Sequence, residues 1–424
     1  MRLLVALLVC ACPAVAWAQS VPAELSLRQA LELAVQRNPT LAAAIEGVAA
    51  AEGGAVTARQ RPNPALTFET AGRSFLSPAP SPDQHEFLFR VDQELEIGGR
   101  RKLRIQAAEQ GVAAGAADAA NVRRELELVV RRAYFAVVLT VANRQAAQEA
   151  LTEIDRVIAL NRTRLEHGEI SGAELRRVQV ERLKFQDDVY ASELSLRNAR
   201  AGLLAALNMP DLGQDFRPAD TLTTVEAAEA AALAAAAPLT RAAMLASTLS
   251  QRPDVQAARV TAQQADTATR LQRALRVPFP TIGAGYRHDA GLASAVIGVT
   301  VPLPLFNRNR GEVLKSEAEA RRKQFDATAV ERGAALDIQQ ALNAVDVSRQ
   351  RVAYIEREYL TTARESRDVM LASYRLGAAN LIDYLDAQRA FRDTLRTYNQ
   401  ALFDQRVGAA SLIAALSITA GRQP

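Results

Sequence analysis

The stretch LGAANLIDYLDAQ, residues 376–388, reads as a turn between two helices. Gly377 can end a helix in the left-handed conformation, and Asn380 can cap the helix that follows. Asp383 and Asp386 lie three residues apart, so both carboxylates project from the same side of that helix. The stretch therefore predicts the tip of a helical hairpin that carries acidic residues.

An earlier stretch, HGEISGAELRRVQ at 167–179, repeats this turn. Gly168 matches Gly377 at a separation of 209 residues, and the same separation relates Ile97 to Phe306. Agreement at distant places indicates an internal duplication. The chain is therefore expected to consist of two long helical hairpins.

The first 18 residues predict a cleaved signal peptide. Arg2 is followed by an apolar run over 3–15 and by Ala-Trp-Ala at 16–18, so cleavage is expected before Gln19. The alternative is a lipoprotein acylated on Cys12. Cys10 and Cys12 are the only cysteines, so on the first interpretation the exported chain has no cysteine.

Composition excludes several classes of protein. The net charge of +4 is small for 424 residues, and acids and bases are interleaved, which does not indicate a nucleic-acid partner. After Gln19 no apolar run is expected to reach the length of a transmembrane helix. If the chain spans a membrane, it must do so with strands.

The first repeat is expected over 19–208. Leu66 and Phe68 alternate with polar neighbours, as do Phe87 and Phe89, and a period of two indicates strands. The expected elements are helices at 25–36 and 40–59, strands at 65–72 and 86–95, a proline-free coiled-coil helix at 100–166, a tip near 168–173 and a returning helix at 173–208.

A composition shift separates the two repeats. Residues 209–250 are interpreted as a linker, with a solvated spacer containing one or two short helices over 209–237. The second repeat is expected over 251–416, with strands at 281–287 and 295–301 and a tip near 377–380. Residues 417–424 form a C-terminal tail.

The predicted fold is mainly α with a small β part. Four strands per chain cannot close a barrel, and lipid does not tolerate open sheet edges. Three copies would supply twelve strands, an even number within the range of outer-membrane barrels. The chain is therefore expected to form a homotrimer if its strands enter a membrane.

The sequence resembles the TolC-like outer membrane factors over essentially the whole mature chain, through the two-repeat plan, the paired strands and the LIDYLDAQ turn. The segments ELEIGGRRKLR at 94–104 and PLPLFNRNRG at 302–311 resemble the branch that serves heavy-metal efflux of the cobalt-zinc-cadmium type. The resemblance implies a trimeric exit duct with a twelve-strand barrel in the outer membrane of a Gram-negative bacterium and an α-helical tunnel in the periplasm. It also implies an equatorial region near 21–36 and 209–250.

The same resemblance implies the partners: outer-membrane lipid, a periplasmic adaptor and an inner-membrane pump of the RND type. Heavy-metal cations are the expected cargo. Multidrug efflux and type I secretion remain alternative duct functions. A periplasmic adaptor usually has one hairpin rather than two, and a structural coiled coil would not need the alternating strands.

The resemblance places the periplasmic entrance at the tips. Asp383 and Asp386 match the family's acidic entrance positions, so three chains would gather six carboxylates near one axis and attract cations. Ala379 stands where a gate arginine occurs in the family, and a contact of Glu174 or Arg177 could replace that lock. The alternative is that these carboxylates are ordinary first-turn residues favoured by the helix dipole.

Small residues at the tips are expected to let the helix tips of an adaptor approach closely. They are Gly168, Ser171, Gly172, Gly377, Ala378 and Ala379. No catalytic constellation, cofactor motif or metal site is expected, because no two of His85, His167 and His288 are close in sequence.

Overall fold

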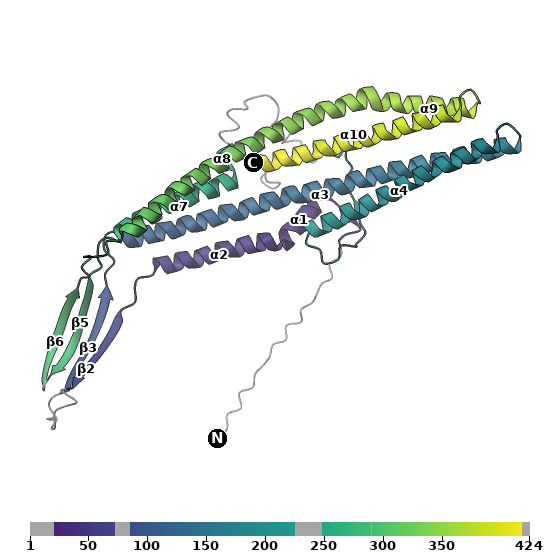
Figure 1. The fold of residues 1–424 in the computed structure, drawn as a ribbon. Coiled ribbons are helices and arrows are strands. Elements are labelled where there is room, and N and C mark those ends of the chain that lie inside the picture. The colour runs from purple at the N-terminus through teal and green to yellow at the C-terminus, as the bar shows by residue number, and fades with distance from the viewer. Residues whose placement is uncertain (1–20, 73–84, 225–247, 290, 418–424) are drawn as a thin grey trace, which may run out of the picture.

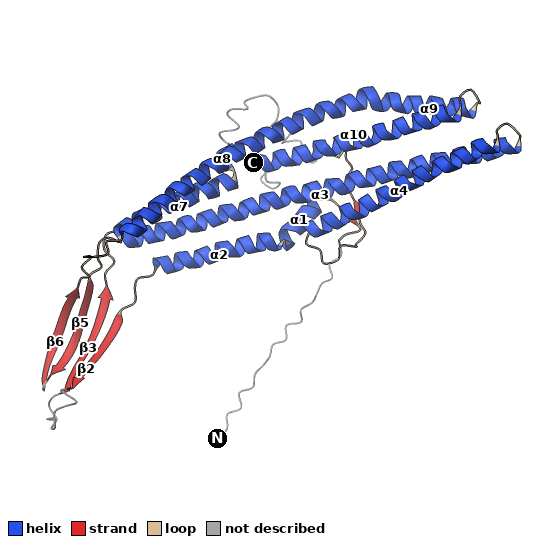
Figure 2. Cartoon of the chain, in the orientation of Figure 1, coloured by secondary structure: helices blue, strands red, loops and turns tan. Residues whose placement is uncertain are grey.

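The computed structural model describes residues 21–72, 85–224, 248–289 and 291–417. These residues form a long bundle of helices with a four-stranded sheet at one end (Figure 1). At the other end lie the two turns that connect α3 to α4 and α9 to α10. Helix α3 (Arg100–Glu166) runs through the bundle and has 67 residues, about 100 Å at the rise of an α-helix. The prediction of a mainly helical chain with a small β part is confirmed, as Figure 2 shows.

The half of the bundle next to the sheet is a layer of four helices. Helices α2 (Pro39–Arg59) and α7 (Pro253–Ala274) both pack against α3, and α8 (Arg310–Tyr354) packs against α7. Within one chain the layer therefore begins with α2 and ends with α8. The other half contains the far part of α3 with α4 (Gly172–Ala206), α9 (Thr361–Arg375) and α10 (Leu381–Ala415).

Shorter helices stack end to end beside the long ones. Helix α1 (Leu27–Arg37) is linked to the end of α4 because the Asn208 side chain donates a hydrogen bond to the carbonyl of Arg37 at 3.1 Å. In the second repeat, Leu249 packs against a cluster that contains Leu412 near the end of α10. Both hairpins are thus continued by a second helix toward the sheet.

The long helix of the second repeat is interrupted, whereas α3 in the first repeat is continuous. Helices α8 and α9 are separated by a π-helical segment, Ile355–Leu360. The sequence there contains no glycine or proline, so no breaker marks the change of winding. Tyr354 and Tyr359 meet edge to face at 5.3 Å beside the π segment.

The four strands form one antiparallel sheet in the order β2-β3-β5-β6. Their bounds are β2 Ala65–Gly72, β3 His85–Glu94, β5 Thr281–Asp289 and β6 Leu292–Thr300; β2 matches the predicted ends, and the others lie within three residues of them. Residues 73–84, which join β2 to β3 in the sequence, lie outside the described residues.

The two faces of the sheet differ in polarity. Pairing of Phe68 with Phe89 and of Phe89 with Tyr286 places aromatic side chains on one face. The other face carries Arg90 paired with Asp92 at 2.9 Å. A Cβ at Gly285 would lie 2.2 Å from the carbonyl oxygen of Phe89, so only glycine fits there. The apolar face is exposed in the single chain, including Leu66, Phe68, Phe89, Val91, Ile282, Tyr286, Ile297 and Val299.

The expectation of a solvated spacer after Met209 is wrong for its described part, 209–224. Met209, Phe216 and Leu222 are buried in the main core with residues of α1 and α3. A short parallel pair, β1 (Glu24–Leu25) with β4 (Arg217–Pro218), joins the N-terminal segment to this stretch. The segment packs into the core because burial removes the large apolar side chains of Met209, Phe216 and Leu222 from water. Residues 225–247, and the short helices expected there, lie outside the described residues.

A buried hydrogen-bond group ties this region to α3. The Tyr134 hydroxyl lies 2.6 Å from the Asp220 carboxylate and 3.0 Å from the carbonyl oxygen of Leu25, while Asp220 also accepts from the backbone of Leu27 at 3.1 Å. Burial is the main cause that raises the pKa of Tyr134. The N-terminal segment, the 209–224 stretch and α3 are therefore one packed unit at mid-length of the bundle.

One helix is apolar on average although it is not an unbroken apolar run. Among the described residues, α2 has the length and apolar composition of a membrane-crossing helix. Glu46 and Glu52 interrupt its apolar residues, so α2 contains no unbroken apolar run of that length. In the bundle, α2 packs along α3 (Figure 1).

Candidate functional site

Both tips are built by the same local chemistry. Gly168 and Gly377 adopt φ values of 74° and 75°. In each turn the glycine amide bonds the carbonyl three residues back, and the next amide bonds the carbonyl five residues back, which is a Schellman ending. Ser171 and Asn380 then cap α4 and α10 by accepting from the backbone amides of Glu174 and Asp383. The predicted turns are thus present, and they lie near each other at one end of the bundle (Figure 1).

An aromatic cluster joins the two turns. Tyr374 and Tyr384 are both buried and stack at 6.0 Å. The Tyr374 hydroxyl bonds Asn161 Oδ1 at 2.6 Å. Arg164, near the end of α3, donates to the carbonyl oxygens of Tyr374 and Arg375 at 3.1 and 2.9 Å. These contacts make the two tips of one chain a single packed end.

Ion pairs continue the connection between the hairpins above the tips. Glu181 on α4 pairs with Arg389 on α10 and with Lys184. Asp188 pairs with Arg392 and lies 3.3 Å from Arg396. Burial alone would raise the pKa of Glu181, but hydrogen bonds from Arg389 and Lys184 outweigh it and lower that pKa. The carboxylate therefore stays charged and holds α4 against α10.

These connecting residues were missed by the sequence analysis. A usable signal existed, because the bonded residues lie close to the repeat separation of 209: Glu181 and Arg389 are 208 apart, and Arg164 and Tyr374 are 210 apart. Equivalent positions of the two hairpins therefore lie at the same height. Aligning the repeats would have placed these side chains opposite each other.

The predicted acidic residues differ in their surroundings. Asp383 and Asp386 are exposed in the first turns of α10, but Asp386 lies 3.2 Å from Arg389 and is partly neutralised. Within the part of the chain that the structure describes, Glu174 and Arg177 form no ion pair with each other or with these aspartates. The replacement lock suggested for Ala379 is therefore not made inside one chain.

The small tip residues leave open space. Nothing lies within 4 Å of a Cβ added at Gly168 or Gly377, whereas one at Gly172 would meet only the Arg176 side chain. Ser171 and Ala378 are exposed, and Ala379 is half-buried. The small residues of the tips thus leave space for a partner, while Leu376 beside Gly377 is 85% exposed.

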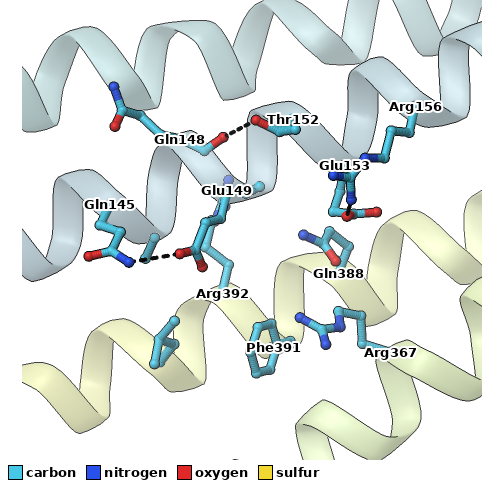
Figure 3. Close-up of a pocket in the computed structure, with 13 residues that line it drawn as sticks. Gln145, Gln148, Glu149, Thr152, Glu153, Arg156, Arg367, Gln388, Phe391 and Arg392 are labelled. Carbon is cyan, nitrogen blue, oxygen red and sulfur yellow. Dashed lines mark hydrogen bonds and ion pairs between the residues drawn. The ribbon is translucent and has the colours of Figure 1, made fainter.

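Above the tips, a pocket of about 430 Å³ lies between α3, α9 and α10 (Figure 3). Glu153 and Gln388 face each other across it, and Arg367 lies over the Phe391 ring at 4.1 Å. Gln388 is 2% exposed, and its Oε1 has no partner among the described residues. No group of three or more His, Cys, Asp or Glu residues in the described ranges is arranged to hold a metal ion.

Comparison with known proteins places this geometry in context. The family model described as "Outer membrane efflux protein" matches residues 30–209 and 244–417. The cobalt-zinc-cadmium resistance protein CzcC of Cupriavidus metallidurans is 28% identical over 86% of this chain and 83% of its own length. The nickel-cobalt-cadmium resistance protein NccC of Alcaligenes xylosoxydans xylosoxydans is 25% identical over 73% of this chain and 67% of its own.

Solved structures share the fold. CusC superposes with a TM-score of 0.72 at 19% identity, covering 92% of this chain and 91% of that one. The outer membrane protein VceC of Vibrio cholerae superposes with a TM-score of 0.75 at 19% identity, covering 92% of this chain and 95% of that one.

Proposed function

Because the chain belongs to the outer membrane efflux protein family, we propose that it is the outer-membrane exit duct of a tripartite pump that exports heavy-metal cations. The duct is a homotrimer with a twelve-strand barrel in the outer membrane and a helical tunnel in the periplasm. Its partners are a periplasmic adaptor and an inner-membrane pump of the RND type. The observation that carries the proposal is the pattern of exposed apolar residues on both edges of the helical layer.

The edge helix α8 exposes Leu314, Phe325, Leu336 and Val347, each eleven residues after the last. The other edge helix, α2, exposes Ile45 and Val56, which are also eleven apart. Eleven residues make almost three whole turns of an α-helix, so such a stripe stays on one face of a nearly straight helix. Because the apolar residues on the two edge helices have the same spacing, they can be buried against each other. The stripe of α8 in one copy therefore packs against that of α2 in the next copy, and the layers of the copies close into a tunnel.

The sheet supports the same closure. Strands β2 and β6 are its unpaired edges. Apolar residues cover one face, and Arg90, Asp92 and Arg287 lie on the other. This alternation is that of a barrel with lipid outside and water inside. Three sheets joined edge to edge remove every open edge.

The cargo is argued from the relatives and from charge. The relatives CzcC and NccC are named as metal resistance proteins. Asp383 is exposed in the first turn of α10, Asp386 is exposed three residues further on beside Arg389, and Glu174 lies in the first turn of α4. A ring of these carboxylates from three chains raises the local concentration of cations at the entrance. The positive charge of Arg177 weakens the attraction for cations at the first hairpin.

The remaining assignments follow from the same plan. The small residues at the two turns, Gly168, Ser171, Gly172, Gly377, Ala378 and Ala379, are the docking surface for the adaptor. Residues 1–18 are removed as a signal peptide during export. That segment, and Cys12 with it, lies outside the described residues.

The test is a matched pair of substitutions on α8. Leu336→Glu places a charge in the apolar stripe, whereas Arg349→Glu changes an exposed charge on another side of the helix, two residues after Val347. Cross-linking of the purified wild type and of R349E should stop at three chains, and L336E should yield mainly monomers. A monomeric wild type, or a trimeric L336E, would reject the closure.

The cargo is tested separately in cells. Deletion of the gene should lower resistance to cobalt, zinc or cadmium salts, and the wild-type gene should restore it. Resistance to hydrophobic drugs should not change. Loss of drug resistance with unchanged metal resistance would mean that the duct exports drugs rather than metal cations.

A further inference from the structure

The junction between the sheet and the helices carries a group of basic residues from both repeats. Helices α2 and α7 end there, and α3 and α8 begin there (Figure 1). We define the basic collar as the exposed residues Arg61, Arg101, Lys102, Arg276, Arg308 and Arg310. Three come from each repeat, so the collar spans the sheet end of the helical layer.

The charges of the collar are not neutralised by salt bridges. Nearby arginines have such partners: Arg59 lies 2.9 Å from Glu109, and Arg273 lies 2.8 Å from Glu317. None of the six collar residues has a carboxylate within 4.0 Å in the ranges that the structure describes. Segments 97–104 and 302–311 contain no acidic residue. The six collar charges are therefore not held in ion pairs within the chain, although Glu94, Glu96 and Glu312 flank these segments in the sequence.

Apolar side chains are interleaved with the collar. Leu303, Leu305 and Phe306 precede Arg308 and are exposed, Phe306 completely. Ile97 precedes Arg101, and Val277 follows Arg276, and both are also exposed. We call these five residues the apolar rim. A surface of this kind suits neither bulk water nor hydrocarbon, but it suits the boundary between headgroups and acyl chains.

Arg100 connects two helices at the junction between the sheet and the bundle. Its Nε donates to the carbonyl of Ala274 at 3.0 Å, and its guanidinium lies 3.7 Å from the centre of the Phe279 ring. Its Nη1 and Nη2 have no hydrogen-bond partner among the described residues. The residue thus ties the start of α3 to the end of α7 and adds another positive charge to the junction.

We propose that the basic collar and the apolar rim bind phospholipids with anionic phosphodiester headgroups in the periplasmic leaflet of the outer membrane. This inference rests on the proposed function, because only a sheet that crosses the membrane brings the collar to that leaflet. The collar residues pair with lipid phosphates, and the rim enters the acyl boundary. The bound lipids set the depth at which the barrel gives way to the tunnel.

The experiment measures the thermal stability of the full-length trimer in neutral detergent, with added phosphatidylglycerol or phosphatidylcholine. Phosphatidylglycerol should stabilise the wild type more, and the difference should shrink as NaCl is raised, because salt screens exposed charges. Each cation near an anionic lipid surface is worth a factor of about five in affinity. The double variant Arg308→Gln with Arg310→Gln should therefore bind phosphatidylglycerol at least about tenfold more weakly.

The matched control is Arg322→Gln with Arg349→Gln, which removes two exposed charges from the same helix away from the junction. It should keep the wild-type lipid response. If R308Q/R310Q does not fold, Arg101→Gln with Lys102→Gln tests the other half of the collar. An equal response to the two lipids, or stabilisation by free inorganic phosphate alone, would overturn the proposal.

Two further outcomes separate this inference from the duct. A wild type that is not trimeric would reject the proposed function before any lipid is added. A trimer that dissociates after Leu303→Ser and Phe306→Ser at all lipid contents would assign the apolar rim to contacts between chains and overturn the lipid site.

Discussion

The stacked tyrosines at the tips allow a prediction with an internal control. Tyr374 and Tyr384 are both buried and their rings stack, but their hydroxyls differ. The Tyr374 hydroxyl bonds Asn161 at 2.6 Å, whereas the Tyr384 hydroxyl has no partner among the described residues. The same change, tyrosine to phenylalanine, should therefore have opposite consequences at the two positions.

The magnitudes follow from the burial of each partner. Tyr374→Phe leaves the side chain of Asn161, which is fully buried, with its Oδ1 unbonded. An unsatisfied buried polar group costs about 1–3 kcal/mol. Tyr384→Phe removes a hydroxyl that is already desolvated without a partner, so the change in local stability should be near zero or slightly favourable. The packing of both rings is retained.

Hydrogen exchange of the full-length protein, followed by mass spectrometry, measures the local effect. Since 1.4 kcal/mol is a factor of ten in an equilibrium constant, backbone amides of α9 and α10 near the turn should exchange about five- to a hundredfold faster in Y374F. In Y384F they should exchange at the wild-type rate or more slowly. Equal rates in the two variants would refute the hydrogen-bond argument.

Three further predictions concern the tips. Burial raises the pKa of Tyr384 to about 12, whereas a tyrosine in the unfolded chain loses its proton near pH 10. Between pH 10 and pH 12 the unfolded state therefore binds fewer protons than the folded state, and the free energy of unfolding should fall by about 2–3 kcal/mol. Y384F should lose that much less in alkaline denaturation, and identical curves would contradict the assignment. Changing Asp383 and Asp386 together to asparagine should weaken cation preference in planar bilayers, more so at low salt; unchanged selectivity at low ionic strength would make them solvated first-turn residues. Replacing Gly377, at φ 75°, by arginine should cost about 1–2 kcal/mol locally and abolish efflux while leaving the trimer intact, whereas retained efflux would move adaptor docking elsewhere.

Local features of the fold were predictable because local chemistry determines them. The turns at Gly168 and Gly377 follow from a left-handed glycine and a side-chain cap a few residues later. The strands follow from the alternation of Phe87 and Phe89 with polar residues. The ends of these helices and strands depend on residues within about five positions in the sequence.

Features that depend on distant neighbours were not predictable in the same way. The bond between Tyr134 and Asp220 joins residues 86 apart, and nothing near Asp220 marks it as part of the core. The π segment at 355–360 carries no breaker residue. At the site, the acidic positions were read directly from the turn, but the partial neutralisation of Asp386 by Arg389 depends on side-chain geometry.

The matching construction of the two turns has a consequence for symmetry. Both tips end in a left-handed glycine and restart at a polar cap, yet one is followed by Glu174 and Arg177 and the other by Asp383 and Asp386. A trimer therefore presents six tips of equal shape that alternate between two kinds of charge. A ring of six identical partner subunits would fit this rim by shape at every position, but it would meet two electrostatic environments in turn, and its subunits would bind with two affinities.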